Sequence, residues 1–159
     1  MRTFIIYILL AYIALAVQSV FFHGVKPDLA FVLVCFYAVR HGQLKGVTYG
    51  ALTGLLIDTA GGFILGPNVI SKALTAYLIS AVKENLFQWN RFISTVMISI
   101  FSLLNILSVY VCLETFSKVS YAGRPWSIPI IEVVYTTAAA AVLFPLFKSK
   151  RSRRYSDFL

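Results

Sequence analysis

Long apolar runs separated by short polar breaks extend along nearly the whole chain. Three of these runs reach the roughly 20 residues that a helix needs to cross a bilayer: Thr3–Phe22, Phe92–Leu113 and Ile128–Phe147. Gln43–Ala60 and Val69–Val82 are shorter runs of the same apolar character. Together with one further short run, the pattern predicts six helices.

The second run, Asp28–Val39, is too short to cross a bilayer unaided. Even extended to Pro27–His41 it reaches only about 22 Å as a helix. We therefore expect it to pack inside a bundle, where protein rather than lipid surrounds it. A tight turn at Arg40–Gly42 leads into Gln43–Ala60, which predicts an antiparallel helical hairpin.

The polar breaks define the remaining connections. Gly61–Asn68 contains three glycines and a proline, so it should be irregular and covered by protein if it lies at membrane depth. Lys83–Arg91 is expected to be a polar turn, and Glu114–Ser127 is the longest polar loop. Met1–Phe22 is longer than the apolar core of a signal peptide and has no small-residue cleavage site after it, so we interpret it as a retained first helix.

Composition agrees with lipid as the main solvent. Apolar residues make up 59% of the 159-residue chain and charged residues 13%, and the charges lie mostly between the apolar runs. The fold class is therefore predicted to be all-α, a polytopic membrane protein with six transmembrane helices in one bundle. Residues 1–147 form the predicted transmembrane domain, and residues 148–159 form a basic cytoplasmic tail.

The net charge is +8, and five of the fourteen basic residues lie in the last twelve positions of the chain. A basic cluster directly after an apolar helix is typical of a topology anchor that also attracts anionic lipids, and this placement argues against nucleic acid as a partner. Counting Lys and Arg on the two sides gives ten against four, which predicts that both termini are cytoplasmic in a bacterial inner membrane. The basic tail comprises Lys148, Lys150, Arg151, Arg153 and Arg154, and the other basic residues on its side are Arg2, Arg40, Lys45, Lys83 and Arg91.

The most regular local pattern is a four-residue repeat of Gly46, Gly50, Gly54 and Asp58 on one helix face. Helices in lipid associate through close backbone approach and inward-facing polar groups, and glycines permit that approach. Two interpretations remain open. The face packs against another helix of the same chain, or it receives a helix of a partner protein.

Ionisable residues inside apolar helices are costly and are therefore usually paired or functional. Asp28, behind Pro27, opens the second helix and is expected to cap it, although it could also belong to a site. Asp58, Lys72 and Glu132 are expected at a similar depth toward the outer face, with Lys72 as counter-charge. This possible outer-side polar cluster serves either structural pairing or contact with a ligand.

Patterns typical of catalysis or of a cofactor site do not occur in the sequence. No serine lies next to a positioned base, no Gly-rich phosphate loop is present, and Cys35 and Cys112 lack metal-ligand spacing. The protein is therefore predicted not to be an enzyme and to bind neither cofactor nor metal.

An ordered series of motifs over roughly residues 15–80 resembles the rod shape-determining protein MreD family. Its elements are a Pro-Asp-Leu that opens the second helix, a basic-Gly turn, the Gly-x3-Gly-x3-Gly-x3-Asp repeat, and a Gly-rich stretch with Leu-Gly. In this chain they are Pro27, Asp28 and Leu29; Arg40 and Gly42; Gly46, Gly50, Gly54 and Asp58; and Gly61, Gly62, Leu65 and Gly66.

The resemblance implies a membrane scaffold subunit of the cell-elongation complex, which maintains cell shape by supporting lateral peptidoglycan synthesis. It implies binding to the single-span protein MreC, with indirect association to MreB, to RodA and to a class B penicillin-binding transpeptidase. It also implies a fold similar to the substrate-binding subunits of energy-coupling-factor transporters. That likeness defines an alternative, a vitamin-binding transporter subunit, and a third possibility is an assembly factor for another membrane complex.

Overall fold

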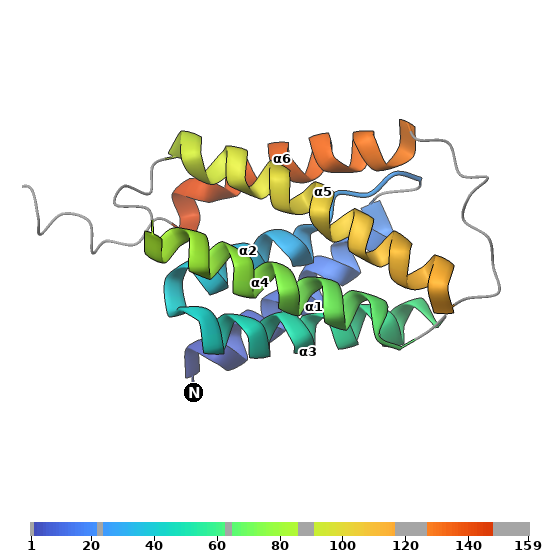
Figure 1. The fold of residues 1–159 in the computed structure, drawn as a ribbon, viewed down its shortest axis with the longest axis horizontal. Coiled ribbons are helices and arrows are strands. Elements are labelled where there is room, and N and C mark those ends of the chain that lie inside the picture. Colours follow the sequence, from blue (N-terminus) through green and yellow to red (C-terminus); the bar gives the residue numbers. More distant parts are fainter. Residues whose placement is uncertain (1, 22–23, 63–64, 86–90, 117–126, 148–159) are drawn as a thin grey trace, which may run out of the picture.

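The computed structural model describes residues 2–21, 24–62, 65–85, 91–116 and 127–147, and every regular element in this part of the chain is an α-helix (Figure 1). The all-helical prediction is therefore confirmed. The helices are α1 (Arg2–Phe21), α2 (Leu29–His41), α3 (Gln43–Gly61), α4 (Pro67–Asn85), α5 (Arg91–Phe116) and α6 (Ser127–Phe147).

Successive helices run in alternate directions, so their ends gather at two opposite ends of the bundle (Figure 1). We call these the N-terminal end, where α1 begins, and the far end, where α1 finishes. The 20 residues of α1 make a helix about 30 Å long, which matches the hydrocarbon core of a bilayer. The longer α5 reaches about 39 Å.

α2 is the central helix of the bundle. It contacts each of the other helices, and all of its residues from Ala30 to Ala38 are buried. A helix surrounded in this way does not need to match the bilayer thickness, because protein supplies its environment. The expectation that the short second helix packs inside the bundle is met for this reason.

α3 and α4 form the most closely packed pair. The backbone of α4 passes directly over the glycine face of α3, so a β-carbon at Gly50 would lie 2.6 Å from the carbonyl oxygen of Lys72. At Gly46 the near neighbour is α2 instead, where an added β-carbon would lie 2.8 Å from that of Ala38. Because glycine has no side chain, the backbones of these helices can approach each other this closely.

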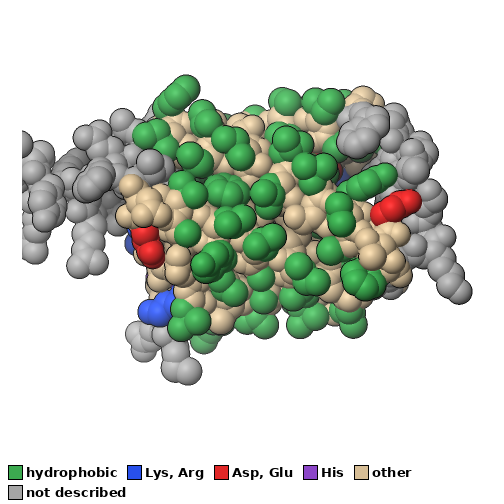
Figure 2. Space-filling model, in the orientation of Figure 1, with side chains coloured by type: hydrophobic (Ala, Val, Ile, Leu, Met, Phe, Trp, Pro, Cys, Tyr) green, Lys and Arg blue, Asp and Glu red, His purple; other side chains and the backbone are tan. Residues whose placement is uncertain are grey.

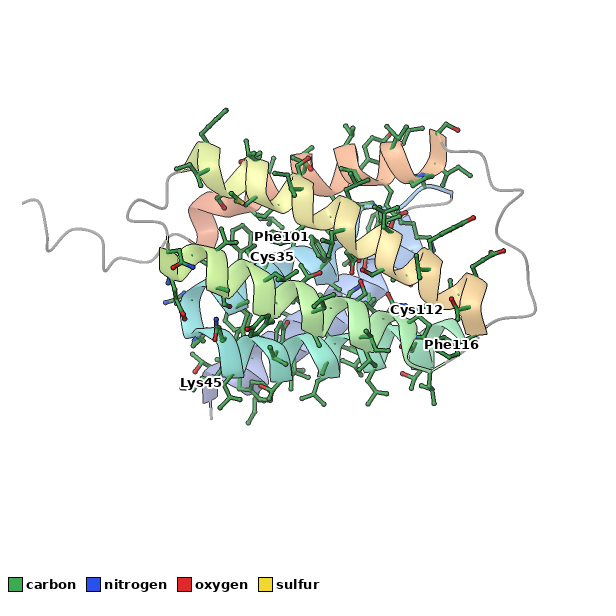
Figure 3. The ribbon with its side chains drawn as sticks, viewed as in Figure 1. Cys35, Lys45, Phe101, Cys112 and Phe116 are labelled. Carbon is green, nitrogen blue, oxygen red and sulfur yellow. The ribbon has the colours of Figure 1, made fainter. Side chains whose placement is uncertain are left out.

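Aromatic rings fill the core near the N-terminal end. Tyr7, Tyr37 and Tyr49 form edge and tilted contacts with centroid separations of 4.5 to 5.9 Å. The Tyr49 hydroxyl donates a hydrogen bond to the Tyr7 carbonyl oxygen at 2.8 Å, which links α3 to α1. Cys35 lies among buried core side chains near Phe101, whereas Cys112 lies near Phe116 toward the end of α5 (Figure 3).

Hydrophobic side chains cover the face seen in Figure 2, and the acidic and basic side chains drawn there lie at the two ends of the bundle. Two described helices are long and apolar enough to cross a membrane, within Thr3–Phe21 and Phe92–Phe116. Leu29–His41 and Ser127–Leu143 are shorter apolar helices. An apolar belt between charged ends is the arrangement expected for a protein in a bilayer.

Several predicted boundaries were wrong by a few residues. α4 begins at Pro67 rather than Val69 and continues to Asn85 rather than Val82. Proline is well suited to the first turn of a helix, since its missing N–H would have no partner there. α5 likewise extends three residues beyond Leu113, so part of the expected polar loop is helical.

Candidate functional site

Asp58 connects the end of α3 to the beginning of α4. Its carboxylate accepts hydrogen bonds from the backbone N–H of Gly66 at 2.8 Å and from those of Asn68 and Val69 at 3.3 Å. The Asn68 side-chain amide donates to the same carboxylate at 2.7 Å. Free N–H groups at a helix N-terminus attract an anion, so a buried carboxylate at this position stabilises the hairpin.

The turn between the two helices requires glycine at two positions. Gly62 ends α3 in the left-handed conformation, with φ of +67°, and its N–H donates to the Asp58 carbonyl oxygen. Gly66 has φ of +131°, a value that side-chain-bearing residues rarely adopt. These glycines let the chain reverse closely enough for the Asp58 side chain to reach the first turn of α4.

Lys72 is the counter-charge in the core, and its partner carboxylate is that of Asp28. The ammonium group lies 2.9 Å from Asp28 Oδ2 and also donates to Asn68 Oδ1 at 3.2 Å. Only 1% of the Lys72 side chain is exposed, compared with 16% of the Asp28 side chain. A buried charge of this kind needs both an opposite charge and hydrogen-bond partners, and the site supplies them.

The segment that enters α2 is a junction for two further helices. Asp28 caps α2 by accepting a hydrogen bond from the Phe31 N–H at 2.8 Å. Its own N–H donates to Thr136 Oγ1 of α6 at 2.9 Å, and the Gln18 side chain of α1 donates to the Pro27 carbonyl oxygen. Pro27 and Asp28 therefore join α1, α2, α4 and α6 at one place.

A separate pair of polar side chains links α4 to α5. Ser71 Oγ donates to Asn105 Oδ1 at 2.7 Å, and both residues are buried. Because Ser71 is adjacent to Lys72, we treat these groups together and call them the polar network. The polar network consists of Gln18, Asp28, Asp58, Asn68, Ser71, Lys72, Asn105 and Thr136.

The polar network has the chemistry of a structural element. Each of its two carboxylates already accepts several hydrogen bonds, and the Lys72 ammonium bridges Asp28 and Asn68. In lipid such interhelical bonds replace the hydrophobic force that holds soluble bundles together. The arrangement therefore ties together all six helices in the half of the bundle nearer the far end.

The structure places the sequence-predicted polar residues differently from the expected cluster. Lys72 pairs with Asp28, and its connection to Asp58 runs through the Asn68 side chain. Glu132 lies in the first turns of α6, where it lines a cavity together with Asp28. The expected cluster therefore includes Asp28 and is divided between a hydrogen-bonded core and a cavity wall.

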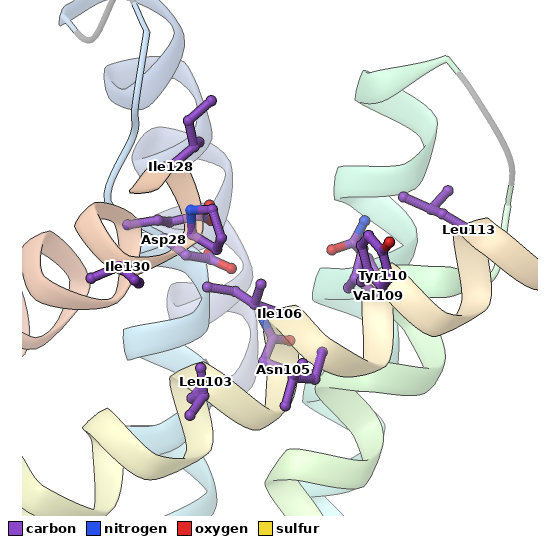
Figure 4. A pocket seen from close by; sticks show the side chains of 13 residues that line it. Asp28, Leu103, Asn105, Ile106, Val109, Tyr110, Leu113, Ile128 and Ile130 are labelled. Carbon is purple, nitrogen blue, oxygen red and sulfur yellow. The ribbon is translucent and has the colours of Figure 1, made fainter. Parts of the chain in front are cut away.

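That cavity, of about 240 Å³, lies between α5 and α6 (Figure 4). Its polar lining groups are Asp28, Asn68, Asn105, Tyr110 and Glu132. The remaining lining residues are apolar: Leu103, Ile106, Leu107, Val109, Leu113, Ile128, Pro129 and Ile130.

The glycine repeat is covered by the protein's own helices. Gly46, Gly50, Gly54 and Asp58 are all buried, and a β-carbon at Gly54 would overlap the Asn68 backbone. Of the two interpretations of this face, intramolecular packing is the one that the structure displays. The five basic residues from Lys148 to Arg154 lie outside the described residues.

Asn68, Ser71 and Thr136 were not singled out from the sequence. Asn68 precedes Lys72 by four residues, a spacing that places both on one helix face, but it was assigned to the irregular stretch before α4. Thr136 belongs to an otherwise apolar segment, and only the fold brings it to Asp28. In the described part of the chain, no three potential metal ligands cluster together.

Neither the curated proteins nor the solved structures contain a match to this chain, so the transporter alternative gains no support. The family model of the rod shape-determining protein MreD matches residues 1–149, nearly the whole chain. This match extends far beyond the motifs in residues 15–80 and confirms the resemblance. The chain belongs to the MreD family of rod shape-determining membrane proteins.

Proposed function

We propose that this protein is a multi-pass membrane scaffold of the cell-elongation machinery that binds the transmembrane helix of an MreC-like protein. The observation that carries the proposal is the family match over residues 1–149. Through MreC it would connect indirectly to MreB, RodA and a class B penicillin-binding transpeptidase, and so support lateral peptidoglycan synthesis and cell shape.

The distribution of polar and apolar side chains supports a scaffold role. The interior polar groups bind one another across helices, while the outer helices carry many exposed apolar residues, such as Tyr12 at 66% and Val142 at 74% exposure. Because α4 covers the glycine face of α3, the partner helix is proposed to pack against the outer surface instead. A helix in lipid can dock on such a surface through close packing.

The alternating helix directions support six membrane crossings with both termini in the cytoplasm. Arg40, Lys45 and Lys83 all belong to helix ends at the N-terminal end of the bundle, together with the start of α1 and the end of α6. Positive charge on one side favours the cytoplasmic orientation of that side. Reporter fusions at residues 87, 121 and 159 are expected to give inside, outside and inside signals; any other order contradicts six crossings.

Affinity purification tests the main proposal. The tagged protein, extracted from native membranes in mild detergent, is expected to retain a single-span MreC-like protein that mass spectrometry identifies. A photo-reactive residue at Tyr12, Ile100 or Val142 should then crosslink this partner from at least one outer helix. A buried site such as Ala76 serves as the matched control and should not crosslink. Recovery of an ATPase-linked transport module in place of shape-determining proteins would contradict the proposal.

A further inference from the structure

The helices around α2 form a ring that is open at one place. α1 contacts α3, α3 contacts α4, α4 contacts α5 and α5 contacts α6, whereas the described residues of α1 and α6 do not contact each other. Helices of similar diameter pack with about six neighbours around a central helix, and this chain supplies five. One position beside α2, between α1 and α6, is therefore left without a helix of this chain.

A groove of about 650 Å³ lies at this open position. One side of it is the end of α1 with the segment that follows, the other side is a face of α6, and the start of α2 lies between them. Among the described residues, no charged side chain lines the groove, so it is compatible with the apolar interior of a bilayer. Its lining includes Phe21, Val25, Leu29, Tyr135, Ala138 and Ala139.

The least buried face of α2 continues the groove along the helix. Leu33 and Phe36 are 6% and 7% exposed, whereas every other residue from Ala30 to Ala38 is at most 2% exposed. Leu29, Leu33 and Phe36 are spaced by four and three residues, so they lie on one helix face and cover about 10 Å of its length. The open position is therefore elongated in the direction of the helices.

Two features of the groove favour a helix as its occupant. Ala138 and Ala139 place small side chains on the α6 side, and small residues allow a second backbone to approach closely in lipid. Lys26 is exposed and lies in the chain between the groove residues Val25 and Pro27. Its ammonium group complements the partial negative charge at the C-terminal end of a helix, or a carboxylate just beyond that end.

We propose that the transmembrane helix of the single-span partner occupies the groove between α1 and α6 and completes the ring around α2. The C-terminal end of this helix lies beside Lys26, so the helix runs parallel to α1. This inference rests on the proposed binding of an MreC-like protein, and it adds the location and the direction of the bound helix.

Photocrosslinking in native membranes tests the location. A photo-reactive residue replaces either Tyr135 in the groove or Tyr77 on α4, and these two side chains are 48% and 50% exposed. The MreC-like protein should be captured about tenfold more efficiently from Tyr135 than from Tyr77, because only the former lies in the groove.

Copurification of the partner in the same samples separates the two proposals. If the MreC-like protein copurifies but crosslinks equally or better at Tyr77, or if Tyr135 captures only lipid, the groove is not the docking site and the proposed function still stands. If the MreC-like protein does not copurify at all, the proposed function fails and the groove assignment fails with it.

A filled groove should exclude the partner. Ala138→Trp places a large ring in the groove and should reduce copurification of the MreC-like protein severalfold. Ala16→Trp, at an exposed position of α1 outside the groove, is the matched control and should leave copurification unchanged. Copurification of the partner with Ala138→Trp at the level of the control would overturn the proposal. If Ala138→Trp unfolds, the crosslinking comparison decides.

The direction of the helix is tested at Lys26. A photo-reactive residue at this position should crosslink to the C-terminal end of the partner's transmembrane helix, as located by mass spectrometry of the joined peptides. Lys26→Glu should also reduce copurification about twofold, since an exposed charge contributes little. Crosslinks to the N-terminal end of the partner helix would overturn the parallel orientation.

Discussion

The α3–α4 hairpin and the α5–α6 pair are both antiparallel helix pairs, yet they are built on different principles. α3 and α4 meet across glycines, and their connection is held by the Asp58 carboxylate. α5 and α6 leave a cavity of about 240 Å³ between them and expose leucine and isoleucine side chains on its rim. One pair is sealed at the far end, whereas a cavity remains between the described residues of the other.

The difference shows where specificity arises in a membrane bundle. Apolar contact alone does not distinguish a neighbouring helix from lipid, so exposed leucines cannot determine which helices pair. Glycines and buried polar groups can determine which helices pair. A glycine permits another backbone to approach closely, and a buried polar group needs a hydrogen-bond partner. We therefore expect stability to depend mainly on the hairpin and the polar network, and partner binding to depend on the outer surface.

The largest effect is expected from Gly54→Leu. A β-carbon at this position would already overlap the Asn68 backbone, and a leucine side chain would force α3 and α4 apart. The variant should lose about 3 kcal/mol or more of stability, measured as thermal unfolding in detergent, and should fail to support rod shape. Ala60→Leu on the exposed part of α3 is the control. A Gly54→Leu protein as stable as this control would remove the distinction between the two helix pairs.

Removal of one partner of the Lys72–Asp28 pair should have the next largest effect. Lys72→Met leaves a carboxylate without its counter-charge, and a loss of about 3 kcal/mol is expected. The double variant Lys72→Met/Asp28→Asn should lose less than the sum of the two single variants. A double-mutant cycle of unfolding free energies measures this coupling, and strict additivity would show that the ion pair contributes nothing specific.

A smaller loss is expected from Asp58→Asn, which keeps the size of the side chain and removes its negative charge. The N–H groups of Gly66 and Val69 would lose a charged acceptor at the helix N-terminus. Unfolding measurements should show about 1 kcal/mol of destabilisation. Thr59→Ser, next to Asp58 but exposed, should be neutral, and a similar loss in both would argue against a specific role of the capping carboxylate.

The smallest effect on stability is expected on the outer surface. Ile100→Val removes one methylene from a side chain that is 53% exposed, and lipid or detergent can replace the lost contact. The unfolding free energy should change by less than about 0.5 kcal/mol. If this substitution instead destabilised the protein as much as Asp58→Asn, the outer surface would be part of the folding core.

The glycine repeat was recognisable from its four-residue spacing, and the ionisable residues were recognisable because charged groups are costly in lipid. Their partners were less accessible to sequence reasoning. Lys72 was predicted to be the counter-charge of an acidic cluster, but which carboxylate it neutralises depends on how α2 and α4 lie beside each other. Thr136 and Ser71 are ordinary helix residues until the fold brings them to Asp28 and Asn105.

By itself, the sequence determined the helical class, the internal position of the short α2 and the membership in a family of shape-determining proteins, since these follow from apolar run lengths and ordered local motifs. The tertiary structure alone decided that α4 fills the glycine face, that Asp28 neutralises Lys72 and that a cavity remains between α5 and α6. The physical reason is the range of the interactions. Hydropathy and local spacing act within one helix, whereas pairing, burial and cavities depend on which helices become neighbours.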